Sequence, residues 1–177
     1  MYWTSDYSWR LVGTPSVRQQ RVYDVPCNSF VPPVNRCIPH WSSLSEDKDP
    51  YNMGWSVYSP SGTSESSMDD PWVYHPPTAN WLETFYRLQG QSDIVYNNGG
   101  YKARIGSSIK ETVKTTTQLV VNHWIDQMTK SVFIELTLYN VDLRSLSQIT
   151  LIIEFLTADV SLRAARVTSV IIDCDDL

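Results

Sequence analysis

The chain has 177 residues and a formal net charge of −5, and 42% of its residues are hydrophobic. This size and apolar content predict one folded domain with a single sizeable core and exclude a disordered chain. The acidic balance leaves no basic excess to neutralise phosphates, which argues against nucleic-acid binding.

Membrane and targeting signals are not evident in the sequence. No apolar run reaches the roughly 20 residues that span a bilayer, and residues 1–6 lack the basic start and apolar middle of a signal peptide. Taken alone, these features predict a soluble chain. Its seven Trp and ten Tyr exceed what such a core usually holds, so we expect some of these rings at partly exposed contacts.

The first predicted element is a polar-faced strand over residues 16–23, which Pro15 can precede. Arg18 and Arg21 lie on this strand. We interpret both arginines as solvated or ion-paired surface residues, with a partner-facing role as the alternative.

The next segment is rich in proline. Nine of the ten prolines fall between residues 26 and 77, together with Ser-rich spacers such as residues 59–64. Proline fixes φ and removes a hydrogen-bond donor, which excludes long helix and central sheet here. We therefore predict a projecting, loop-rich excursion over residues 26–80. The aromatic segments at residues 55–58 and 72–75 are candidates to pair as a small hairpin within it.

Two cysteines, Cys27 and Cys37, enclose nine residues of the excursion. A disulfide between them would stabilise the fold by roughly 2.5 to 3 kcal/mol through loop closure. Reduced thiols or metal ligation are the alternatives, although His40 nearby completes no paired zinc motif.

The region from residue 79 to residue 105 contains weaker signals. Trp81, Phe85 and Leu88 have helical spacing, but their aromatic content also permits a strand. Residues 94–96 and 101–105 flank an Asn-Asn-Gly-Gly run, which predicts a hairpin. No Lys-Ser/Thr follows these glycines, so a phosphate-binding loop is not supported.

Residues 107–122 form the clearest predicted helix, with a capping box from Ser108 to Glu111. An apolar stripe is expected to bury itself across the sheet, and Trp124 is expected to fill the junction with the next strand. The stripe consists of Ile109, Val113, Thr116 or Thr117, and Val120.

Two strands follow, at residues 132–140 and 149–155, and both alternate so that every second side chain shares a face. In the first strand, residues 132, 134, 136 and 138 form the apolar face. A one-residue slip would bury Glu135, so the register is well specified. A turn or short helix is expected between the strands, and a closing strand over residues 166–172.

No catalytic or metal-binding group can be assembled from the sequence. The three histidines, His40, His75 and His123, form no ligand pair or nucleophile motif, and His123 is interpreted as structural. Glu135 and Glu154 resemble a glycosidase carboxylate pair only superficially, and we interpret both as solvent-facing. We therefore predict no enzyme activity, no cofactor and no metal.

Several motifs occur in a characteristic order across residues 10–155. They are Gly-Thr-Pro-Ser-Val-Arg-Gln-Gln-Arg-Val at residues 13–22, the pair Cys27 and Cys37, Gly99-Gly100-Tyr101, Trp124-Ile125-Asp126 and the strands at 132–140 and 149–155. This ordered set resembles the extracellular domain of the polycystins. The Tyr-Asn-Met-Gly-Trp run at residues 51–55 further resembles the polycystin-1-like branch.

The fold expected from the residues and the resemblance is one α+β domain over residues 1–177. An antiparallel sheet is packed by a helix on one face, and a loop-rich excursion at residues 26–80 is tied by a Cys27–Cys37 disulfide, which the resemblance implies. An oxidising compartment follows from such a bond. Cys174 has no evident partner, and the family's loop after residue 155 is not matched. The sequence also lacks any Asn-x-Ser/Thr acceptor, which is unexpected for this family.

The resemblance also implies a function. The chain would be the extracellular or lumenal domain of a cation channel subunit, involved in calcium transport, that sits above the pore in a plasma or ciliary membrane. It would join neighbouring polycystin subunits of a homo- or hetero-tetramer, including a polycystin-2-like subunit, and contribute to gating. The membrane helices would lie outside this chain.

Site residues follow from this interpretation. The expected subunit contacts are Trp55, Tyr58, Trp72 and Tyr74, and the expected core residues are Trp124, Phe133, Tyr139 and Phe155. The alternative function is a secreted or ectodomain ligand-binding module that uses exposed aromatic side chains to bind sugar or peptide.

Overall fold

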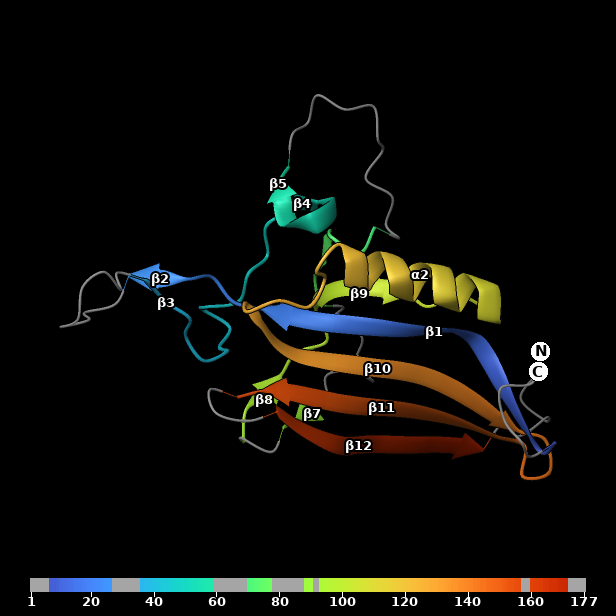
Figure 1. The fold of residues 1–177 in the computed structure, drawn as a ribbon. Helices are drawn as coiled ribbons and strands as arrows, with labels where there is room; N and C mark the ends of the chain where they lie inside the picture. The colour runs from blue at the N-terminus through green and yellow to red at the C-terminus, as the bar shows by residue number, and fades with distance from the viewer. Residues whose placement is uncertain are drawn as a thin grey trace.

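The computed structural model describes residues 7–26, 36–58, 70–77, 88–90, 93–156 and 160–171, without the side chains of residues 161–166. A six-stranded antiparallel sheet with strand order β12-β11-β10-β1-β9-β6 dominates the described residues (Figure 1). Its strands are β1 (Trp9–Arg21), β6 (Tyr74–His75), β9 (Gly100–Arg104), β10 (Thr129–Asn140), β11 (Ser145–Phe155) and β12 (Val160–Ile171).

Three two-stranded ladders and a helix complete the described structure. The ladders join β2 (Val25–Pro26) with β3 (Arg36–Cys37), β4 (Tyr51–Asn52) with β5 (Ser56–Val57), and β7 (Leu88–Gln89) with β8 (Val95–Tyr96). A 3-10 turn, η1 (Met53–Trp55), connects β4 to β5, and the helix is α2 (Ile109–Val121). The β2–β3 ladder projects beyond the end of the sheet where β1 finishes, whereas the β4–β5 ladder lies above the sheet on the side of α2 (Figure 1).

The long strands confirm the sequence predictions for this part of the chain. β10 and β11 contain the two predicted strands in one antiparallel register, with Phe133 opposite Ile152. The intervening residues form a turn, and β12 begins earlier than predicted. β1 also begins earlier, at Trp9, because the strand resumes after an irregularity between Val12 and Ser16. Gly13 takes a φ of 71° at that irregularity, a value that glycine adopts without strain.

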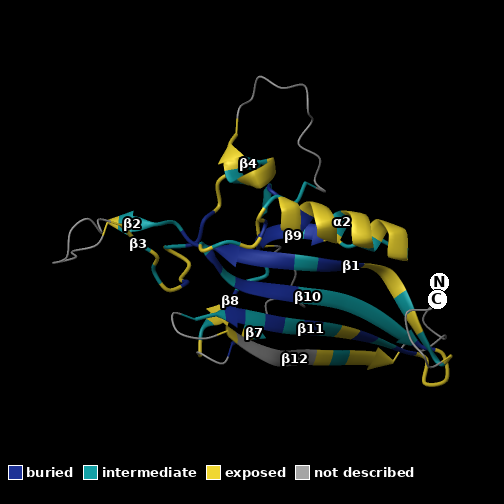
Figure 2. Cartoon of the chain, viewed as in Figure 1, coloured by how far each residue is buried: buried dark blue, intermediate teal, exposed yellow. Residues whose placement is uncertain are grey.

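Two hydrophobic clusters cover opposite faces of the sheet near the end of β1. One cluster consists of Val22, Trp41, Tyr96, Phe133 and Ile152. The other consists of Trp72, Tyr101, Ala103, Leu119 and Trp124. Figure 2 shows that the buried residues of the sheet gather toward this end. Two of the predicted core residues, Trp124 and Phe133, are therefore buried, whereas Tyr139 and Phe155 are half-buried.

Both predicted hairpins are wrong. β5 pairs with β4, whereas β6 joins the main sheet beside β9. Likewise β8 pairs with β7, whereas β9 pairs with β1. The turn between β8 and β9 is held from β1, since Arg18 Nη1 donates to Gly99 O at 2.8 Å and Gln20 Nε2 donates to Asn97 Oδ1 at 2.6 Å. These contacts direct the chain away from local pairing.

The helix cap is as predicted, but the buried face of the helix is not. Glu111 N donates to Ser108 Oγ at the N-cap. The apolar stripe remains in solvent, because Ile109, Val113 and Val120 are 65%, 59% and 72% exposed. Leu119 is the buried residue of α2, and it lies about 100° around the helix from Val120. α2 is accordingly mostly exposed (Figure 2).

Several predictions fall on residues 27–35, 59–69, 78–87 and 172–177, which lie outside the described residues. They concern Cys27, Trp81, Phe85 and Cys174, and the pairing of Cys27 with Cys37 stays a prediction. Of the helices described, none has the length and apolar character needed to cross a membrane.

Candidate functional site

Charged side chains are buried where the excursion crosses the end of β1. Arg18, Arg21, Glu46 and Asp47 are only 2%, 4%, 3% and 2% exposed. Buried charges are tolerated when they are paired and hydrogen-bonded. The prediction that Arg18 and Arg21 lie on the surface is therefore wrong, although both are ion-paired as expected.

Asp47 connects the excursion to the sheet through side-chain and backbone contacts. Its carboxylate accepts hydrogen bonds from the hydroxyls of Tyr51 at 2.9 Å and Tyr101 at 3.1 Å. Arg21 Nε lies 3.6 Å from Asp47 Oδ2, an ion pair longer than a hydrogen bond, while Arg21 Nη1 reaches Asp126 Oδ1 at 2.7 Å. The backbone adds a hydrogen bond from Asp47 N to Arg21 O at 2.9 Å.

The neighbouring Glu46 makes a second set of links. Its carboxylate accepts from Tyr74 Oη at 3.1 Å and from Asn97 Nδ2 at 3.0 Å, and it pairs with Lys48 Nζ at 3.3 Å. These contacts tie the first half of the excursion to β6, the part of the excursion that joins the main sheet, and to the turn before β9. Two adjacent carboxylates thus each join the excursion to a different part of the sheet.

Trp55, at the end of the turn η1 between β4 and β5, completes the site. Its backbone φ is 59°, a value that bulky residues rarely adopt without compensating contacts. The Arg21 guanidinium lies 3.5 Å from the centroid of its ring, and Trp55 Nε1 donates to His123 O at 3.0 Å. The ring also meets Tyr51 and Tyr101 edge-on, with centroids 5.4 and 5.0 Å away.

The end of α2 supplies the acceptor for Trp55. His123 takes a φ of 50°, and its N–H donates to Val120 O, while Trp124 N donates to Leu119 O. This is the Schellman arrangement, which returns Trp124 onto Leu119 and leaves the carbonyl of His123 facing the excursion. The structural interpretation of His123 agrees with this geometry.

We call Arg21, Asp47, Tyr51, Trp55 and Tyr101 the anchor cluster.

A second charged group lies further along β1 and β10. Arg18 Nε and Lys102 Nζ contact the Glu135 carboxylate at 2.9 and 3.3 Å. Burial alone would raise the pKa of Glu135, but the two cations outweigh burial and hold the pKa below its usual value. Glu135 is therefore half-buried and ion-paired rather than solvent-facing.

Glu154 also differs from the sequence interpretation, because it is fully buried and accepts from Tyr96 Oη at 2.8 Å. Glu154 lies opposite Ser131, four residues from Glu135 along β10, which separates the two positions by about 13 Å. That spacing does not suit a glycosidase pair. No group of three or more potential metal ligands occurs within the described part of the chain.

The four residues predicted to contact other subunits differ in exposure, and the rings of two of them, Trp55 and Trp72, meet with centroids 6.4 Å apart. Trp72 is 3% exposed, and Trp55 and Tyr74 are half-buried, so these rings pack mainly within the chain. Tyr58 is 37% exposed. The sequence analysis missed Glu46 and Asp47, whose only signal is a dense acidic and aromatic run at residues 46–51.

The buried tyrosines predict a loss of stability at alkaline pH. Burial and the nearby carboxylates raise the pKa of Tyr51, Tyr74 and Tyr101 above the usual value of 10.0. Above pH 10 the unfolded chain releases these protons before the folded chain does, so stability falls as pH rises. The slope is about 1.4 kcal/mol per pH unit from Tyr101 alone.

Urea unfolding at a series of pH values between 8 and 12 measures this slope. Tyr101→Phe should flatten it, whereas Tyr7→Phe, at an 87% exposed position, should leave it unchanged. A slope that is the same in both variants would contradict the assignment.

Comparisons with known proteins agree with the ordered motifs. A family model described as the polycystin domain matches residues 2–172. The chain is 28% identical over 145 residues to Polycystin-1-like protein 3 of Mus musculus, which covers 81% of this chain and 6% of that protein. It is 30% identical over 148 residues to Polycystin-2-like protein 2 of Homo sapiens, covering 82% and 21%. The match to Polycystin-1 of Homo sapiens is 29% over 161 residues, covering 88% and 3%. The chain therefore spans a small part of these relatives.

Proposed function

Since the chain belongs to the polycystin domain family, we propose that it is the extracellular or lumenal domain of a polycystin-type channel subunit and joins neighbouring subunits through its loop excursion. The observation that carries this proposal is the anchor cluster, which attaches the excursion to the sheet by buried ion pairs and hydrogen bonds. A contact surface that must bind another subunit gains affinity when it is held in one conformation beforehand.

The excursion also presents apolar side chains to solvent. Met53, Val57 and Tyr58 are 56%, 86% and 37% exposed, and we call them the excursion tip. Exposed apolar groups that are held in place are typical of protein contacts. In this proposal Tyr58 contacts the partner, whereas Trp55, Trp72 and Tyr74 orient the tip from within the chain.

The remaining parts of the channel belong to the rest of a longer protein. We propose that membrane helices outside this chain hold it in a plasma or ciliary membrane, in a homo- or hetero-tetramer of polycystin subunits that includes a polycystin-2-like subunit. Movement of the domain would then contribute to gating of a cation pathway, including calcium, that lies elsewhere.

Light scattering over a concentration series tests the assembly step, with the chain alone and mixed with the equivalent domain of a polycystin-2-like subunit. A mixed or self-associated species is expected. Val57→Asp at the tip should weaken it at least tenfold. Leu44→Asp, at a 97% exposed position outside the tip, should leave it unchanged. A strict monomer in both samples would instead favour a ligand-binding module.

We propose that a disulfide supports the base of the excursion. Cys37 is disulfide-bonded, and the β2–β3 ladder places Val25, two residues before Cys27 in the sequence, opposite Cys37. We propose Cys27 as its partner. Cys27→Ser should loosen the excursion and weaken assembly in light scattering, whereas the sheet should stay folded and still show a cooperative thermal transition. Cys174→Ser is the control, and unchanged assembly by Cys27→Ser would contradict the proposed clamp.

A further inference from the structure

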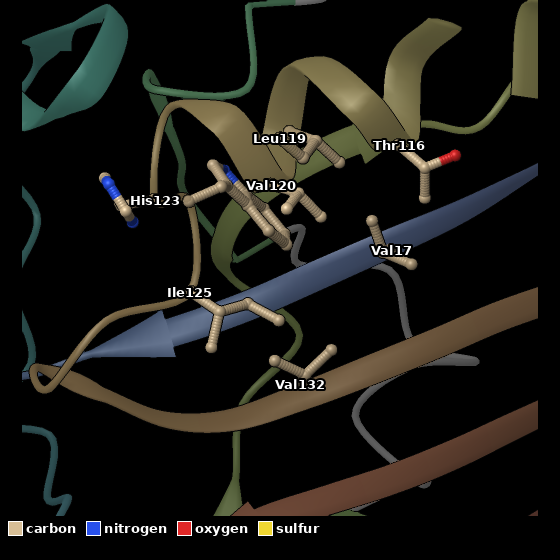
Figure 3. Close-up of a pocket in the computed structure, with 8 residues that line it drawn as sticks. Val17, Thr116, Leu119, Val120, His123, Ile125 and Val132 are labelled. Atoms are coloured by element: carbon tan, nitrogen blue, oxygen red, sulfur yellow. The ribbon is translucent and has the colours of Figure 1, made fainter. Parts of the chain in front are cut away.

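A groove of about 360 Å³ lies between the end of α2 and the face formed by β1 and β10 (Figure 3). We call it the α2 groove. Its lining comes from the helix, from the corner after the helix and from both strands. The apolar members are Val17, Leu119, Val120, Trp124, Ile125 and Val132.

The groove has a buried floor and an open rim. Leu119, Trp124 and Val132 are 7%, 2% and 3% exposed, whereas Val120 and Ile125 are 72% and 49% exposed. The floor is therefore covered by protein on its inner side, while the rim leaves apolar surface in contact with water. Covering that rim with an apolar ligand would remove this surface from water, which is favourable.

The polar atoms of the lining are already used within the chain. Thr116 Oγ1 donates to Thr112 O, and Trp124 Nε1 donates to Pro71 O at 2.9 Å. The lining contains no Asp, Glu, Lys or Arg, and the imidazole of His123 points away from the groove (Figure 3). A charged or strongly polar group inside would lose its hydration without gaining a partner.

The size of the groove sets the length of a fitting ligand. A cavity of about 150 Å³ with similar lining accommodates benzene, so about 360 Å³ suits a hydrocarbon of about a dozen carbons. A peptide is disfavoured because its backbone N–H and C=O groups would lack partners. A bilayer surface is disfavoured because the groove floor, including Trp124 and Val132, is buried.

We propose that the α2 groove binds the hydrocarbon chain of a free single-chain amphiphile, with about a dozen carbons inside and the polar head at the rim. The sequence pattern predicts that the apolar stripe of α2 packs against the sheet. In the structure one residue of that stripe, Val120, lines the groove instead, and in this proposal the ligand covers it. The proposal is independent of subunit assembly.

The test is quenching of Trp fluorescence by a brominated dodecanol, with competition by linear alcohols of 6 to 16 carbons. Saturable binding is expected. Affinity should rise about fourfold per methylene and then level off near 12 carbons, when the groove is full. Dodecanoate compared with dodecanol reports the effect of head charge. Phosphatidylcholine vesicles report bilayer binding.

Two adjacent valines provide matched variants. Val120 lines the groove, whereas Val121 does not, and the two are 72% and 67% exposed. Val120→Asp should weaken dodecanol binding at least tenfold, and Val121→Asp should leave it within twofold. Thermal melting establishes that both variants fold. Equal loss in both variants, affinity that keeps rising beyond 12 carbons, or binding to vesicles but not to monomeric alcohols would overturn the proposal.

Discussion

Replacing Phe133 with alanine is expected to lower the free energy of unfolding by about 3 to 5 kcal/mol, as truncation of a large buried aromatic does. Phe133 is fully buried in the cluster with Val22, Trp41, Tyr96 and Ile152. Its ring meets Tyr96 edge-on with centroids 5.5 Å apart, and the Arg18 guanidinium carbon lies 3.9 Å from its centroid. Alanine would remove these contacts and leave a cavity in this hydrophobic cluster.

Urea unfolding followed by far-UV circular dichroism measures this effect. Phe133→Leu keeps most of the apolar volume and should lose much less stability than Phe133→Ala. Leu143→Ala, at a 66% exposed turn residue, should change stability by less than about 0.5 kcal/mol. Wild-type stability in Phe133→Ala would mean that β10 does not form the centre of the core.

Replacing Asp47 with alanine is expected to destabilise the fold by about 3 to 5 kcal/mol, the range for removing one partner of a buried ion pair. The change would remove the acceptor of the Tyr51 hydroxyl and would leave Tyr101 Oη with the Asp49 carbonyl as its acceptor. It would also leave Arg21 with Asp126 as its remaining carboxylate partner. Because these groups connect the excursion to β1, we expect the excursion to detach before the sheet unfolds.

Asp49→Ala is the matched control for Asp47→Ala. Asp49 is exposed, and Tyr101 Oη contacts its backbone carbonyl, which the substitution retains. Its loss should cost less than about 1 kcal/mol. Hydrogen exchange separates the two regions in Asp47→Ala. Protection should be lost first at Asp47 N and Tyr23 N, whose hydrogen bonds to Arg21 O and Ser45 O join the excursion to the end of β1. Equal stability of the two variants would show that the anchor cluster contributes little.

The long strands could be predicted because their evidence is local. β10 and β11 alternate over many residues, and a single register satisfies both. The cap at Ser108 is equally local, since its acceptor and donor are three residues apart. The short strands have two residues each, and their pairing depends on distant side chains such as Arg18 and Gln20. No periodicity in so short a segment encodes such a partner.

The candidate site was harder to predict for a related reason. Arg21 has the composition of a surface residue, and its burial depends on Asp47 and Asp126, the latter 105 residues away in sequence. The stripe of α2 illustrates the opposite error. Its apolar spacing is real, but spacing alone does not show whether protein, solvent or a ligand covers it.

β10 connects the end of the sheet that carries the excursion with the end where β1 begins and β12 finishes. Thr129 lies opposite Arg21 beside the anchor cluster, whereas Asn140 lies opposite both Trp9 and Ser145, and Ser145 lies opposite Ile171. The start of β1 and the finish of β12 thus share one end of the sheet, and the excursion occupies the other. With 12 residues in β10, the two ends are about 40 Å apart. In a sheet that moves as a rigid body, a tilt of about one degree at the Trp9 end would displace the excursion by roughly 0.7 Å.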